Sequence, residues 1–137
     1  MRLIWALTLM GVSLASMAKE ALVSSPNGKL MVKISDEHSQ PQYSVFFYDQ
    51  LIMQPSALGL VFKQQAPFTE GFKIMNLETA KNDSEWQQPW GERRIVRDKH
   101  NEAVVTLSNS NLPSATVKGA ILSGEYKVRF RVFDDGL

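Results

Sequence analysis

The chain has 137 residues, 44% of them hydrophobic, and its 15 Lys and Arg residues almost balance its 14 Asp and Glu residues. This length suffices for one hydrophobic core, and the balanced charge gives no electrostatic basis for binding nucleic acid or an anionic membrane surface. The sequence has no cysteine, which excludes disulfide bonds and thiolate metal sites.

The first stretch has the three regions of a secretory signal peptide. Arg2 supplies the basic start, an apolar stretch follows from residue 3 to about 14, and Ser-Met-Ala at 16–18 fits a signal peptidase site. The alternative, a buried N-terminal helix, fits the three regions less well. The apolar stretch is also shorter than the roughly 20 residues of a membrane span. We therefore predict that residues 1–18 are removed, that the protein is periplasmic or secreted, and that no membrane span remains after cleavage.

Short extended segments follow in the first half of the chain. A turn at residues 26–28 separates two of them, and in the second Leu30, Val32 and Ile34 share one face. The runs 43–47 and 51–53 flank a turn at 49–50, and a Pro-Ser pair at 55–56 is expected to end the second run.

The second half continues the same pattern. Residues 71–79 form another apolar run, and Ala103, Val105 and Leu107 share one face of the next. No stretch keeps a helical apolar period. The sequence therefore predicts an all-β fold, an antiparallel β-sandwich of two sheets.

The last predicted strand, residues 126–133, alternates bulky apolar side chains with Lys127, Arg129 and Arg131. These cations form either a solvated face or protection for a sheet edge. The strand leads into Asp134-Asp135-Gly136, a hairpin turn signal that requires a returning strand, yet only Leu137 follows. We therefore expect residues 19–137 to be an incomplete sandwich domain, the beginning of a longer protein.

The sequence shows no catalytic apparatus. It lacks a phosphate-binding loop, a nucleophile elbow and a calcium loop. His38 and His100 lie far apart in the sequence, and each is expected at the surface. The adjacent acids Asp134 and Asp135 are explained by the turn. We predict that the chain holds no catalytic residue and no metal site of its own.

The segment "SEWQQPWGERRIVRDKHNE" is the best candidate for a binding site. It places Trp86 and Trp90 on either side of a proline and is rich in charged side chains. Tryptophan faces can stack on sugar rings while polar neighbours bind hydroxyl groups. The alternative is that both rings pack in a core or interface and the charges form a solvated loop.

The order of the motifs "SPNGKLMVKIS", "PSALGL", "PWGER" and "FDDG" resembles the N-terminal domain of glycoside hydrolase family 97 over about residues 24–137. The family includes α-glucosidases and α-galactosidases. The resemblance implies a β-sandwich followed by a (β/α)₈ barrel that carries the catalytic acids and most calcium ligands. This chain would then be inactive alone, with an α-glucoside or α-galactoside and the missing catalytic barrel as its partners and calcium as the cofactor of the full-length enzyme only.

The resemblance also implies roles for individual residues. Trp90, Gly91, Glu92 and Arg93 lie in the family-like "PWGER" stretch and, with Trp86, are candidates for a substrate-binding or barrel-facing surface. Glu92 is a candidate calcium ligand only together with oxygens from a barrel. Two alternatives remain open: a free-standing carbohydrate-binding module of the periplasm, and a structural β-protein that pairs its open edge with a partner.

Overall fold

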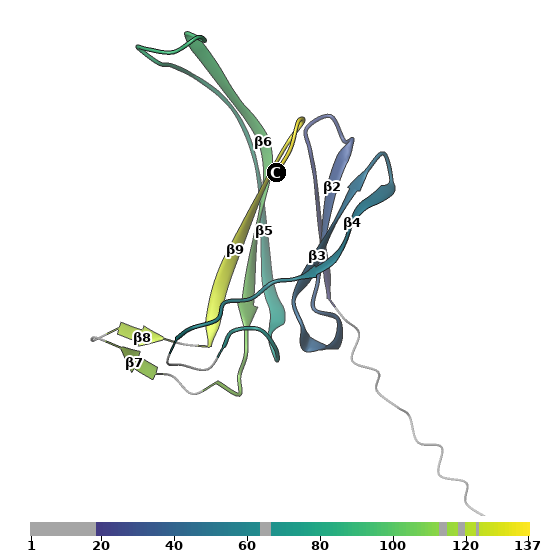
Figure 1. Cartoon of the computed structure of the whole chain (residues 1–137), viewed down its shortest axis with the longest axis vertical. Helices are drawn as coiled ribbons and strands as arrows, with labels where there is room; N and C mark the ends of the chain where they lie inside the picture. Colours follow the sequence, from purple (N-terminus) through teal and green to yellow (C-terminus); the bar gives the residue numbers. More distant parts are fainter. Residues whose placement is uncertain (1–18, 64–66, 113–114, 118–119, 123) are drawn as a thin grey trace, which may run out of the picture.

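The computed structural model describes residues 19–63, 67–112, 115–117, 120–122 and 124–137, so the predicted signal peptide, residues 1–18, lies outside the described residues. Almost all regular structure is β (Figure 1). The elements in chain order are β1 (Glu20–Ser24), β2 (Leu30–Ser35), a 3₁₀ turn η1 (Glu37–Ser39), β3 (Gln42–Phe47), β4 (Gln50–Ala57), β5 (Lys73–Gln87), β6 (Ile95–Ser108), β7 (Ala115–Val117), β8 (Ala120–Leu122) and β9 (Glu125–Phe133).

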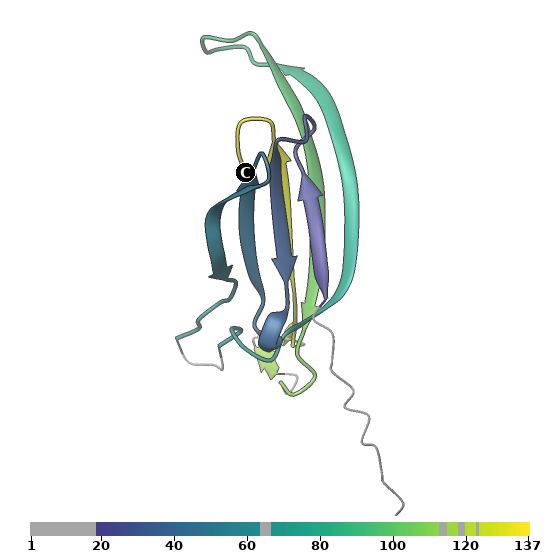
Figure 2. The same cartoon turned by 90° about the vertical axis from the view of Figure 1, so that its right-hand side faces the viewer.

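Two antiparallel sheets face each other across one core. A four-stranded sheet has the order β1-β2-β3-β4, a three-stranded sheet has the order β5-β6-β9, and β7-β8 form a separate small hairpin. Figure 1 shows the two larger sheets side by side, and Figure 2, turned by 90°, shows the four-stranded sheet in front of the three-stranded one. The prediction of an antiparallel all-β sandwich is confirmed. Both sheets contribute to the core, which comprises Ala21, Val23, Leu30, Val32, Ile34, Val45, Phe72, Ile74, Ala103, Val105, Leu107 and Val132.

The alternating positions found in the sequence face this core. Val32 and Ile34 of β2 are fully buried, as are Ala103, Val105 and Leu107 of β6. Successive side chains of a strand point to opposite faces, so one apolar residue in two is enough to cover the inside of each sheet. The period-2 pattern therefore identified the core-facing side chains of these strands correctly.

Strand boundaries differ from expectation in two places. The prediction that Pro55 and Ser56 end a strand was wrong, because β4 runs through both. Since β4 is an edge strand, a proline can lack its N–H there without removing a bond of the central ladder. The predicted run at 71–79 was too short: β5 continues to Gln87 because it pairs with β6 as far as Ile95.

One buried carboxylate joins the two sheets. Asp36, just after β2, is 8% exposed, and its two oxygens accept hydrogen bonds from the backbone nitrogens of Lys19 at 2.7 Å and Ile74 at 2.9 Å. Ile74 lies on β5, so the carboxylate satisfies a buried amide of the opposite sheet. Buried backbone donors require such partners, and Asp36 therefore fixes how the two layers meet.

The predicted turn after the last strand is present. The Phe133 amide donates to the Gly136 carbonyl at 2.8 Å, and the two residues form an antiparallel bridge. Within the described ranges, no helix is long and apolar enough to cross a membrane.

Candidate functional site

The β5–β6 hairpin projects beyond the rest of the sandwich as a curved arm, residues 82–100 (Figures 1 and 2). The arm separates from the other sheet near Asn101, whose side-chain amide donates to the Ser24 carbonyl of β1 at 2.7 Å. Beyond this point β5 and β6 pair in register from Asn82–His100 to Gln87–Ile95. The loop 88–94 forms the tip.

No second sheet covers the arm, so its two strands have no packed core between layers. Polar side chains connect them instead. The guanidinium of Arg97 donates to both oxygens of Asp83, at 2.8 and 2.9 Å. These bonds lower the pKa of the Asp83 carboxyl and raise the pKa of Arg97. The Asn82 amide bridges to the Asp98 carbonyl at 2.9 Å. Exposed ion pairs of this kind stabilise a strand pair only slightly, so the arm depends mainly on its backbone ladder.

The loop at the tip is closed by the Gln88 residue. Its backbone amide donates to the Arg94 carbonyl at 3.1 Å, and its side-chain amide donates to the Arg93 carbonyl at 2.7 Å. Gly91 has φ +116°, a region that L side chains rarely adopt, and a Cβ there would lie 3.0 Å from the Gln88 amide nitrogen. The glycine of "PWGER" is therefore required by the shape of the loop.

The structure brings the five predicted site residues together at the tip. Trp90, Gly91, Glu92 and Arg93 are all exposed in the loop, while Trp86 lies at the end of β5 opposite Val96. The side chains of Trp86 and Trp90 are 52% and 81% exposed, so the alternative that they pack in this domain's core is wrong. Ile95 adds a third apolar side chain, 54% exposed. Exposed aromatic groups at the end of a projecting hairpin are typical of a binding surface.

A shallow hollow lies beside this aromatic group. It is lined by Gln87, Gln88, Pro89, Gly91 and Arg94, which combine amide groups, a guanidinium and an apolar pyrrolidine ring. Such a surface can hydrogen-bond hydroxyl groups while neighbouring indole rings stack on a sugar face.

The tip does not form a metal site by itself. Among the described residues, no group of three or more His, Cys, Asp or Glu is arranged to hold a metal ion. Calcium takes six to eight oxygen ligands, and Glu92 would supply at most two from an exposed loop. These residues alone do not fit a calcium ion, and a role for Glu92 as one ligand among others stays a prediction.

Sequence reasoning missed a buried histidine at the base of the arm. His38 is exposed as expected, but the expectation for His100 was wrong, because this side chain is buried. The His100 ring lies 4.9 Å from the Phe133 ring, and its Nδ1 lies 2.6 Å from an Asp98 oxygen. The spacing Asp-x-His could have signalled the carboxylate contact, whereas the cover by Phe133 depends on pairing between β6 and β9.

Glu102 extends this polar cluster on the outer face of the sheet. Its carboxylate accepts from Arg131 at 2.9 Å and lies 3.5 Å from Arg129. The hydrogen bond from Arg131 is the main reason why the pKa of Glu102 is lowered. Two members of the Lys/Arg row of the last strand, Arg129 and Arg131, therefore form ion pairs with Glu102 on the outside of the sheet.

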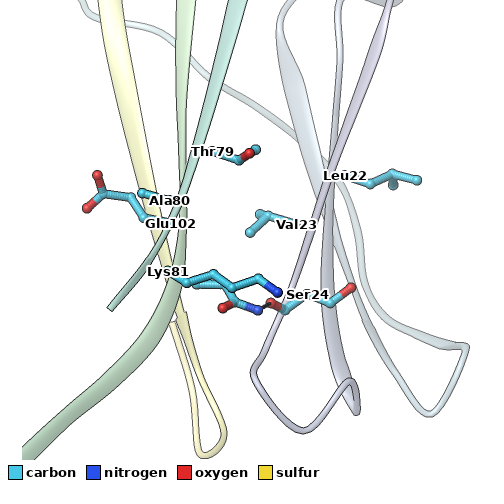
Figure 3. A pocket seen from close by; sticks show the side chains of 8 residues that line it. Leu22, Val23, Ser24, Thr79, Ala80, Lys81 and Glu102 are labelled. Carbon is cyan, nitrogen blue, oxygen red and sulfur yellow. Dashed lines mark hydrogen bonds between the residues drawn. The ribbon is translucent and has the colours of Figure 1, made fainter. Parts of the chain in front are cut away.

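A second hollow lies between β1 and β5, where the sheets meet at the base of the arm. Figure 3 shows Val23 and Thr79 directed into this space and Lys81 extended toward Ser24. An adjoining hollow shares Lys81 and Asn101 with it. This groove is open and has a mixed polar and apolar lining, and it lies at the opposite end of the arm from the tryptophans.

Comparison with known proteins identifies the relatives of this fold. A family model described as Glycosyl-hydrolase 97 N-terminal matches residues 23–137. Structures of a Glycoside Hydrolase Family 97 enzyme from Pseudoalteromonas sp. strain K8, in complex with panose or with acarbose, are 44% identical with a TM-score of 0.72. A β-arabinopyranosidase structure has a TM-score of 0.67 at 23% identity, which shows the fold alone. Each match covers 83% of this chain but only 16% of the other chain.

Proposed function

This chain belongs to the glycosyl-hydrolase 97 N-terminal family, and we propose that it is the non-catalytic N-terminal part of an exported α-glycosidase. The observation that carries this proposal is the family match over residues 23–137, together with 44% identity to an enzyme solved with oligosaccharides. The matched part is 16% of that enzyme. The catalytic groups would then belong to a (β/α)₈ barrel, with calcium as the cofactor of the complete enzyme. The substrate would be an α-glucoside or an α-galactoside.

In the complete enzyme, the arm would give this domain a specific role at the sugar pocket. It projects from the sandwich and ends in exposed indole rings and polar groups, which suits it to reach the barrel and line one side of its sugar pocket. The backbone hydrogen bonds between β5 and β6 fix the arm to the sandwich. The indole rings at the tip supply apolar contact area with few rotatable bonds.

A second candidate is a free-standing carbohydrate-binding module of the periplasm. The 81% exposure of Trp90 favours it, because the ring is accessible without any other domain. The two candidates differ in where the sugar binds: to the tip alone, or to the tip and the barrel together.

A domain exchange tests the first candidate. We would replace the matching part of the Pseudoalteromonas enzyme with residues 23–137 and measure panose binding by calorimetry. Changing Trp90 to Ala should weaken binding about five- to tenfold, corresponding to about 1 kcal/mol for one stacked aromatic ring. Ile52→Ala serves as the matched control because it shortens an exposed apolar side chain of β4, away from the arm, and it should change binding less than about twofold.

The free chain tests the second candidate. The sequence has three tryptophans, one of them in the predicted signal peptide, so fluorescence of the processed chain reports on Trp86 and Trp90 directly. If panose changes the fluorescence of the free chain with the affinity measured in the exchanged enzyme, the module is the better description. If Trp86→Ala and Trp90→Ala both leave binding unchanged in the exchanged enzyme, the tip has no role in sugar binding.

A further inference from the structure

Asn101 lies where the core-facing side of β6 ends. Leu107, Val105 and Ala103 alternate along this side and are fully buried, and Asn101 is the next residue on it. Its side chain is half-buried, whereas Lys99, two residues nearer the tip of the arm, is exposed. Asn101 is therefore the last side chain on this side of β6 that the opposite sheet covers.

The side-chain amide of Asn101 bonds to a carbonyl that points away from β2. The Ser25 amide donates to the Leu30 carbonyl at 2.8 Å, across the turn that joins β1 and β2. In a trans peptide the carbonyl points opposite to the amide of the next residue, so the Ser24 carbonyl points to the outer side of β1. Asn101 donates to it at 2.7 Å. This bond satisfies a carbonyl of an edge strand and joins it to the central strand of the other sheet.

The bond crosses the groove between β1 and the base of the arm (Figure 3). Asn101 and Lys81 line both of the adjoining hollows, so open space lies on either side of the bond. Among the described residues, no hydrogen bond joins residues 82–100 of the arm to the four-stranded sheet. The angle of the arm at its base therefore depends on few contacts with β1, of which the Asn101 bond lies nearest the arm.

A small tilt at the base would move the tip of the arm far. Six residue pairs follow beyond Asn101, from Asn82–His100 to Gln87–Ile95. At about 3.3 Å per residue they span about 20 Å, so a tilt of about 10° would move the tip by about 3.5 Å. Stacked aromatic groups have their centroids about 4.5–7 Å apart, so a displacement of this size is enough to remove a stacking contact.

We propose that Asn101 is a positioning residue. Its bond to Ser24 fixes the angle at which the arm leaves the sandwich, and hence the place where Trp86 and Trp90 meet the sugar. This role rests on the proposed function, because it takes the tip as part of the sugar site. Asn101 lies at the other end of the arm and acts on sugar affinity only through the tryptophans. An arm that is already in place loses less freedom when the sugar binds, which strengthens binding.

Two spin labels on the purified chain measure the position of the arm without any sugar. The chain has no cysteine, so Gln54→Cys on β4 and Glu92→Cys at the tip provide unique labelling sites, and double electron–electron resonance gives the distance between them. Asn101→Ala should shift or broaden this distance by about 3 Å, as expected for a tilt of about 10°. Asn82→Ala is the matched control. It also removes an amide-to-carbonyl bond of a half-buried asparagine, at 2.9 Å, but that bond lies within the arm, so the distance should not change.

Panose binding by the exchanged enzyme measures the consequence for the sugar site. Asn101→Ala should weaken binding about fivefold and Asn82→Ala less than about twofold, because only the first displaces the tip. In a protein that already carries Trp86→Ala and Trp90→Ala, Asn101→Ala should have no further effect. A general loss of stability would not produce this dependence on the tryptophans.

An unchanged label distance in Asn101→Ala, or an equal change in Asn82→Ala, would overturn the proposal. Unchanged panose binding in Asn101→Ala would also overturn it if Trp90→Ala weakens binding. If neither tryptophan affects binding, the proposed function of the tip fails and the role of Asn101 at the sugar site fails with it, whereas the label distance still shows whether the bond fixes the arm. If far-UV circular dichroism shows that Asn101→Ala does not fold, Asn101→Thr replaces it, since threonine favours a strand and its hydroxyl is too short to reach Ser24.

Discussion

Replacing Asp36 by Ala should cause a large loss of stability for a single polar side chain. The carboxylate is 8% exposed and accepts the amides of Lys19 and Ile74, and Ile74 is itself only 4% exposed. The Ala variant leaves the Ile74 amide buried without a partner and removes hydrogen bonds to a charged acceptor. We expect the free energy of unfolding to fall by about 3 kcal/mol, because an unsatisfied buried donor costs about 1–3 kcal/mol and a bond to a charged group contributes a similar amount.

Urea denaturation followed by far-UV circular dichroism measures this loss. Tryptophan fluorescence would be a poor probe, since Trp86 and Trp90 lie on the exposed arm and change their environment little on unfolding. Glu37→Ala is the matched control, because it removes the next carboxylate along the chain, which is exposed. That variant should stay within about 0.5 kcal/mol of the unmodified chain.

Two results would refute this reasoning about Asp36. The first is a change in unfolding free energy below about 0.5 kcal/mol for Asp36→Ala, which would mean that water satisfies the Ile74 amide. The second is an equal loss for Glu37→Ala, which would mean that local chain preference, and not the link between the sheets, determines the effect. In thermal melts, a loss of about 3 kcal/mol should lower the midpoint by about 10 °C or more.

Two further predictions concern Tyr126 on the core side of β9 and Glu102 of β6, which pairs with the arginines of β9 on the outer side. The hydroxyl of Tyr126 is buried without a hydrogen-bond partner among the described residues, and burial raises its pKa. Tyr126→Phe should therefore be as stable as the parent or up to about 1 kcal/mol more stable at neutral pH. It should also lose less stability above about pH 10, where the unfolded tyrosine ionises but the folded one does not; an identical alkaline loss in both proteins would contradict this. The pKa of Glu102 is lowered by the hydrogen bond from Arg131, so its contribution is present above its ordinary pKa and lost as the pH falls through the lower folded value. Glu102→Gln should flatten the decline of the urea midpoint between about pH 5 and 3, and an unchanged slope would show that other carboxylates cause the decline.

Local chemistry was enough to predict the strands that form the core. Two sets of alternating apolar residues are buried in the fold because each set covers one face of a sheet: Leu30, Val32 and Ile34, and Ala103, Val105 and Leu107. Turn residues at 26–28 and 134–136 also act locally, and both turns are present. The motif order that resembles the family is likewise a property of the sequence, and the family match confirms it.

The tertiary structure decided the features that depend on which strands become neighbours. Pro55 signals a break in isolation, but it is tolerated because β4 lies at an edge. His100 is buried only because β9 places Phe133 beside it. The tryptophans of the arm are exposed because β5 and β6 extend beyond the opposite sheet, which no local pattern encodes. Period and turn chemistry act over a few residues, so the sequence by itself determined the strands and their inner faces. Burial and exposure arise from pairing between distant segments, so only the assembled sheets determined the arm and the buried histidine.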